Sequence, residues 1–134
     1  MTVDDHRRLI LVADDDADIL ALVAFRLRCD GHDVVTAGNG EDALELARER
    51  TPDLLVLDIR MPGVTGLDVL RELRSSEATG AIPVILMTAS VQDESLERGY
   101  AAGADDYVMK PFSTEDLTRR VEALLAGASP QGVG

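Results

Sequence analysis

The chain has 134 residues, 46% of them hydrophobic, a single cysteine and a formal net charge of −12. This length suits one domain that buries its own core, and a lone cysteine excludes an internal disulfide, so we expect a reducing, cytoplasmic location. The negative charge argues against direct binding to nucleic acid or membranes, residues 1–8 are too polar for a signal peptide, and no apolar run approaches the ~20 residues that span a bilayer.

Short apolar runs alternate along the chain with amphipathic stretches. The runs are rich in Val, Ile and Leu, as is typical of strands buried on both faces, and the stretches between them have helical periodicity. In chain order we expect a strand at Leu9–Ala13, a helix at Ala17–Asp30, a strand at Val34–Ala37, a helix at Glu41–Arg50, a strand at Leu54–Ile59, a helix at Leu67–Arg74, a strand at Pro83–Ala89, a helix at Asp93–Ala102, a strand at Tyr107–Met109 and a last helix after Ser113.

The ends of two helices carry specific signals. Asp16 is expected to be the N-cap of the first helix, and Gly31 is expected to end that helix in a left-handed conformation. Ser113 with Asp116 resembles a capping box at the start of the last helix, which we expect to end at Gly127.

Strict alternation of strand and helix predicts an α/β fold, a doubly wound parallel sheet with helices on both faces. We expect an N-terminal arm at residues 1–8, one domain at 9–127, and a tail or the start of a linker at 128–134. Functional sites of such sheets form at the carboxyl ends of the strands.

Residues at those strand ends form a candidate site. Asp14 and Asp15 follow the first strand, Asp58 lies in the third, Thr88 in the fourth, and Lys110 follows the fifth. Three converging carboxylates repel one another unless a cation lies among them, and an all-oxygen cluster favours a hard ion, Mg²⁺ rather than Ca²⁺.

This set of groups suits phosphoryl transfer, with Asp58 as the nucleophile, a metal ion, the Thr88 hydroxyl and the Lys110 ammonium. Asp58 alone lies inside a buried strand run rather than in an acidic cluster. Lys110 is the only lysine, every other basic side chain being arginine, which suggests that a compact charge is needed there.

The chain resembles the receiver domain of bacterial two-component response regulators, with the size of the single-domain chemotaxis type. The stretches that carry the resemblance are LILVADDDADIL, LLVLDIRMPGVTGLDVLRELR, PVILMTAS and AAGADDYVMKPF. It implies a flavodoxin-like three-layer fold with five strands in the order 2-1-3-4-5, an order that is a known property of this fold and that comes from the resemblance alone.

The resemblance also implies roles for single residues. By motif position Asp58 matches the phosphoacceptor, Asp15 a direct metal ligand, Asp14 a ligand acting mainly through water, and Arg60 a ligand through its backbone carbonyl. Thr88 matches the switch hydroxyl that follows the phosphoryl group, and Tyr107 the aromatic residue whose ring turns inward as Thr88 moves. Lys110 matches the lysine of the family's site, and the Lys110–Pro111 peptide bond is expected to be cis.

The implied activity is a switch that catalyses its own phosphorylation and dephosphorylation with Mg²⁺ and is not an enzyme with an external product. The implied partners are a sensor histidine kinase or histidine phosphotransfer protein and a downstream protein that binds the face of the fourth helix, fifth strand and fifth helix. Phosphorylation-dependent homodimers are a further implication. The sequence does not identify the kinase, the pathway or the output. It also does not indicate the oligomeric state or whether an effector domain follows residue 134.

Other interpretations stay open. An aspartyl-nucleophile phosphohydrolase usually needs a second aspartate two residues after the first, where this chain has Arg60, and a degenerate interaction module would lack intact site residues. Arg60 and Ser90 stand at positions that tune phosphoryl lifetime in similar proteins, so that lifetime is not predicted.

Four further residues have modest expectations. In the family that the chain resembles, Asp or Asn is common at the position of Thr65, so Thr65 is expected to affect loop stiffness. Ala13 stands where that family more often has a larger aliphatic residue, and it is expected to be a packing residue. Cys29 is expected to be a buried or half-buried side chain, and His6 and His32 to face solvent without a role.

Overall fold

The computed structural model describes residues 7–89 and 94–127, where strands and helices alternate as predicted. The predictions for the arm and tail, and those for His6, Ser90 and Asp93, fall outside these residues. The elements are β1 (Leu9–Ala13), α1 (Ala17–Cys29), β2 (Asp33–Ala37), α2 (Gly40–Arg50), β3 (Leu54–Asp58), α3 (Gly66–Arg74), β4 (Val84–Thr88), α4 (Glu94–Ala102), β5 (Asp106–Met109) and α5 (Thr114–Leu125).

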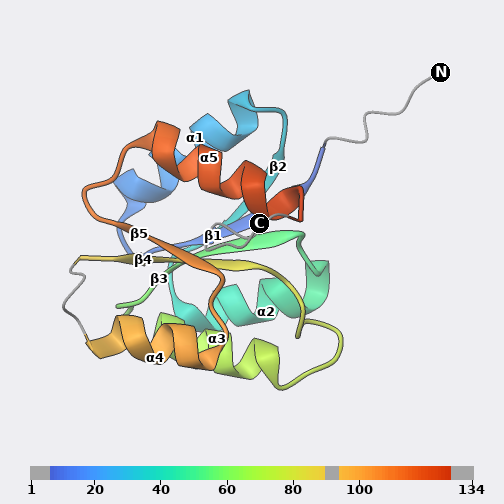
Figure 1. The fold of residues 1–134 in the computed structure, drawn as a ribbon, viewed down its shortest axis with the longest axis vertical. Coiled ribbons are helices and arrows are strands. Elements are labelled where there is room, and N and C mark those ends of the chain that lie inside the picture. Colours follow the sequence, from blue (N-terminus) through green and yellow to red (C-terminus); the bar gives the residue numbers. More distant parts are fainter. Residues whose placement is uncertain (1–6, 90–93, 128–134) are drawn as a thin grey trace.

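The strands form one parallel sheet in the order β2-β1-β3-β4-β5, which confirms the expected topology. Helices α1 and α5 cover one face of the sheet, and α2, α3 and α4 cover the other (Figure 1). The three-layer α/β architecture is therefore confirmed. Within the described part of the chain, no helix has the length and apolar character to cross a membrane.

Alternate residues of each strand enter two separate cores. In β1, Ile10 and Val12 pack with the cluster under α1 and α5, whereas Leu11 and Ala13 pack with the cluster under α2 and α3. This two-residue period, with both faces covered, explains why the strands read as continuous apolar runs. Ala13 is fully buried, in agreement with its expected packing role.

Helix ends agree in part with their sequence signals. The Asp16 carboxylate accepts hydrogen bonds from two N–H groups of the first turn of α1, and Gly31 has a left-handed φ of 96°, so both predictions are confirmed. Ser113 accepts from the Asp116 N–H as expected. A full capping box occurs instead at α3, where Thr65 and Asp68 bond each other's backbone, and this one was not predicted from the sequence.

The predicted solvent exposure of two side chains, those of His32 and Cys29, is wrong. His32 is 5% exposed, because the turn that closes α1, with the His32 N–H bonded to the Leu27 carbonyl at 3.1 Å, brings its ring to α5, where Nε2 lies 2.7 Å from Glu122 Oε2. Cys29 is exposed. It follows the buried Leu27 by two residues, a rotation of about 200° around the helix, which turns it away from the core.

Candidate functional site

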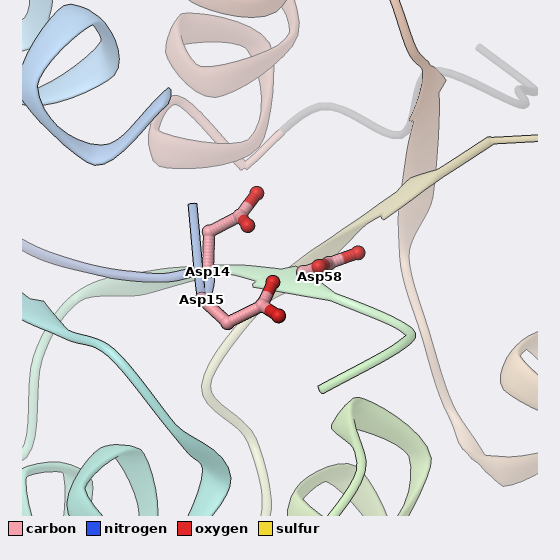
Figure 2. A group of neighbouring side chains, drawn as sticks. All are labelled: Asp14, Asp15 and Asp58. Atoms are coloured by element: carbon pink, nitrogen blue, oxygen red, sulfur yellow. The ribbon is translucent and has the colours of Figure 1, made fainter. Parts of the chain in front are cut away.

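The carboxyl ends of the central strands bring the predicted carboxylates together. Asp14 and Asp15 directly follow β1, and Asp58 is the last residue of the neighbouring β3. Figure 2 shows the three side chains gathered at this edge of the sheet, and one carboxylate oxygen of each lies within 4.8 Å of the others. The convergence expected from topology is therefore present.

Asp14 is held from two sides. It is fully buried, its Oδ1 accepts the Asp16 N–H at 2.9 Å, and its Oδ2 accepts from Lys110 Nζ at 2.8 Å. Its own N–H donates to the Ala37 carbonyl of β2 at 3.1 Å. The turn into α1 and the ammonium from the end of β5 thus fix the orientation of this carboxylate.

The loop after β3 closes tightly around Asp58, which is 6% exposed. Its Oδ1 accepts the Arg60 N–H at 3.3 Å, and its Oδ2 lies 3.4 Å from Lys110 Nζ. A Cβ atom on Gly66 would lie 2.2 Å from the Asp58 carbonyl oxygen, so only glycine permits this approach of α3. Gly66 had no predicted role, although its place directly after Thr65, at the start of a helix, is a signal that could have pointed to it.

Burial and a neighbouring negative charge raise the proton affinity of Asp58. Desolvation, and then the charge of Asp14, raise the pKa of Asp58 to about 6, against the opposing effects of Lys110 and the Arg60 N–H. Because the neighbouring carboxylate charge disfavours ionisation of Asp58, a cation bound among these carboxylates would be stabilised.

Lys110 directly follows β5, and its ammonium contacts both buried carboxylates, Asp14 and Asp58. Burial works against its charged form, but the hydrogen bond with Asp14 and the charge of Asp58 raise the pKa of the Lys110 ammonium. The backbone N–H of Lys110 donates to the Thr88 carbonyl at 2.7 Å, and the Lys110–Pro111 peptide bond is cis, as predicted. The backbone of Lys110 is therefore bonded to β4, while its ammonium contacts the carboxylate cluster.

The remaining predicted residues lie in β4 and β5 or in the loop after β3. Thr88 is buried at the end of β4. Tyr107, half-buried in β5, pairs edge to face with Tyr100 of α4, their ring centroids 5.9 Å apart. Arg60 is exposed, and its backbone N–H donates to the Asp58 carboxylate.

Comparisons with known proteins agree with this geometry. Residues 10–122 match the family model described as the response regulator receiver domain. The chain is 42% identical over 122 residues to the phosphate regulon transcriptional regulatory protein PhoB of Rhizobium meliloti (strain 1021). The matching stretch covers 91% of this chain and 54% of that protein. The chain thus spans about half the length of the curated relatives it matches.

Two solved structures show the same architecture. The receiver domain of the sensor histidine kinase PA1611 from Pseudomonas aeruginosa PAO1, described with a magnesium ion coordinated in its active site cleft, has a TM-score of 0.83 at 28% identity, covering 89% of this chain and 98% of that chain. The chemotaxis protein CheY4 of Vibrio cholerae has a TM-score of 0.80 at 29% identity, covering 85% of this chain and 95% of that chain.

Proposed function

The chain belongs to the response regulator receiver domain family, and from this premise we propose that Asp58 is the aspartate that takes the phosphoryl group. Receiver domains of two-component systems are phosphoacceptor switches that accept a phosphoryl group on an aspartate and control output domains. The observation that carries the assignment is the position of Asp58 at a central strand end, in contact with Lys110 and within 4.8 Å of the two other carboxylates.

We also propose that the cluster holds Mg²⁺. The donor set fits, because the three side chains offer carboxylate oxygens, and because burial and then the charge of Asp14 raise the pKa of Asp58, an effect that a cation would oppose. Asp15 and Asp58 would be direct ligands, Asp14 would act mainly through water, and the Arg60 carbonyl would complete the protein's share. When bound, the ion would neutralise charge on the oxygens of the transferred group.

Each remaining residue has a distinct part in the transfer. In its charged form Asp58 supplies the attacking oxygen, since a protonated carboxyl is a poor nucleophile. Lys110, now shared between Asp14 and Asp58, would pair with the phosphoryl oxygens, and the buried Thr88 hydroxyl would donate a hydrogen bond to them. The exposed Asp15 leaves one side of the cluster accessible to a donor.

The signal would leave the site through Thr88 and Tyr107. Thr88 pairs with Met109 across β4 and β5, and Tyr107 contacts Tyr100 of α4, so movement of Thr88 toward a phosphoryl group would alter the face formed by α4, β5 and α5. This face is the proposed surface for a downstream protein or a phosphorylation-dependent homodimer.

The proposed donors are a sensor histidine kinase or a histidine phosphotransfer protein, in the cytoplasm. The chain would also promote loss of its own phosphoryl group rather than turn over an external substrate. The two other hypotheses have weaker support: Arg60 stands where a phosphohydrolase would place its second carboxylate, and the intact constellation argues against a degenerate module.

Intact-mass measurement after incubation with acetyl phosphate tests this function. We expect one phosphoryl adduct with Mg²⁺, none with EDTA, and none in Asp58→Asn. An unmodified mass in a folded, Mg²⁺-binding wild type would contradict the proposal and favour the degenerate module.

A further inference from the structure

A hollow of about 610 Å³ lies directly beside the phosphorylation site. It shares Asp15 and Arg60 with that site and continues to α3 and α4, where Arg71 of α3 and Arg98 of α4 line it. Its size lies within the range of sites that hold small metabolites. In a chain of net charge −12, three guanidinium groups, those of Arg60, Arg71 and Arg98, outnumber the two carboxylates, those of Asp15 and Asp68, that line this hollow.

The charge of Arg71 is only weakly compensated. Its nearest carboxylate, Asp68, lies 3.9 Å away, and both side chains are more than half exposed. Asp68 is engaged elsewhere, since its Oδ2 accepts from the Thr65 N–H and hydroxyl, each at 3.0 Å. An exposed contact at this distance contributes little, so Arg71 keeps the capacity to bind an anion in the hollow.

We propose that this hollow receives the acyl part of a small acyl phosphate while Asp58 takes its phosphoryl group, an inference that rests on the proposed function. A bond forms between phosphorus and an Asp58 carboxylate oxygen as the bond from phosphorus to the acyl oxygen breaks. The electron pair stays on the acyl oxygen, which leaves as a carboxylate, and no proton moves. Arginine's planar fork matches a carboxylate, so the guanidinium groups stabilise the charge that develops on the leaving group.

Comparing two phosphodonors with different leaving groups distinguishes stabilisation of the leaving carboxylate from a general attraction of anions to the hollow. Acetyl phosphate releases acetate, whereas phosphoramidate, protonated on nitrogen, releases neutral ammonia when its phosphorus–nitrogen bond breaks. Rates of adduct formation are measured by mass at about 1 M salt, where long-range attraction is screened. The variant is Arg71→Gln. The matched control is Arg48→Gln, since Arg48 of α2 is 53% exposed against 55% for Arg71, and pairs with Glu72 at 3.0 Å outside the hollow.

We expect Arg71→Gln to slow transfer from acetyl phosphate by about twofold to fivefold with little change for phosphoramidate, the range expected for one exposed charge. Arg71→Gln with Arg98→Gln should widen the difference, and Arg48→Gln should leave both rates unchanged. Equal slowing of both donors, or no slowing of either, would overturn the inference. Phosphorylation of the wild type by neither donor would instead refute the proposed function itself.

Discussion

Replacing Asp58 by asparagine should stabilise the protein at about pH 8 in the absence of divalent cations. Burial and the charge of Asp14 raise the pKa of Asp58 from 3.8 to about 6. The folded protein therefore binds this proton more tightly than the unfolded chain, and the resulting stability is complete below pH 3.8 and lost as pH rises through about 6. The shift corresponds to about 3 kcal/mol in the free energy of unfolding.

Urea unfolding with EDTA, followed by circular dichroism, measures the difference between wild type and Asp58→Asn. We expect the variant to be more stable by about 3 kcal/mol at about pH 8 and by about half as much at about pH 5. Mg²⁺ at a hundred times its Kd should stabilise the wild type by about 2.7 kcal/mol and remove most of the difference. Asp15→Asn, at an exposed position, should gain much less. A gain independent of pH, or a less stable Asp58→Asn variant, would refute the reasoning.

Three further substitutions test the packing and charges of the site. Asp14→Asn removes the like charge beside Asp58 and should lower the pKa of Asp58 below about 6, which a carbon-13 NMR titration of its carboxyl would follow; an unchanged value would contradict the charge assignment. Lys110→Met leaves both buried carboxylates without their cation, so the same titration should give a higher pKa, and urea unfolding at about pH 8 a loss of about 3 kcal/mol. Gly66→Ala should lower the free energy of unfolding by about 1–3 kcal/mol, because its Cβ would lie 2.2 Å from the Asp58 carbonyl oxygen, whereas Gly38→Ala, with nothing within 4 Å, should change it little. Equal effects of the two glycine substitutions would argue against the close approach.

Most of the fold could be predicted because its signals are local and repeated. The apolar run at Leu54–Ile59 predicts β3 to within one residue, and Asp16 and Gly31 mark the ends of α1. The site carboxylates could be predicted as well, because parallel strands bring Asp14 and Asp58 to one edge wherever the intervening helices lie.

The errors concern side chains whose surroundings depend on distant elements. His32 is polar and lies in a turn, and its burial arises from contact with Glu122, ninety residues later in the chain. Arg71 likewise gains significance only from the hollow that it lines with α4 and the β3–α3 loop. The capping box of Thr65 and Asp68 is a different kind of miss, because its signal is local: the two residues have the three-residue spacing that is typical of this motif.

Site mapping tests the central claim most directly. The protein is phosphorylated with acetyl phosphate and Mg²⁺, treated with borohydride, which reduces an aspartyl phosphate to homoserine, and digested for peptide mass spectrometry. We predict homoserine at position 58 and unmodified aspartate at Asp14 and Asp15. Homoserine at either of those residues, with Asp58 intact, would contradict the assignment of Asp58 as the phosphoacceptor.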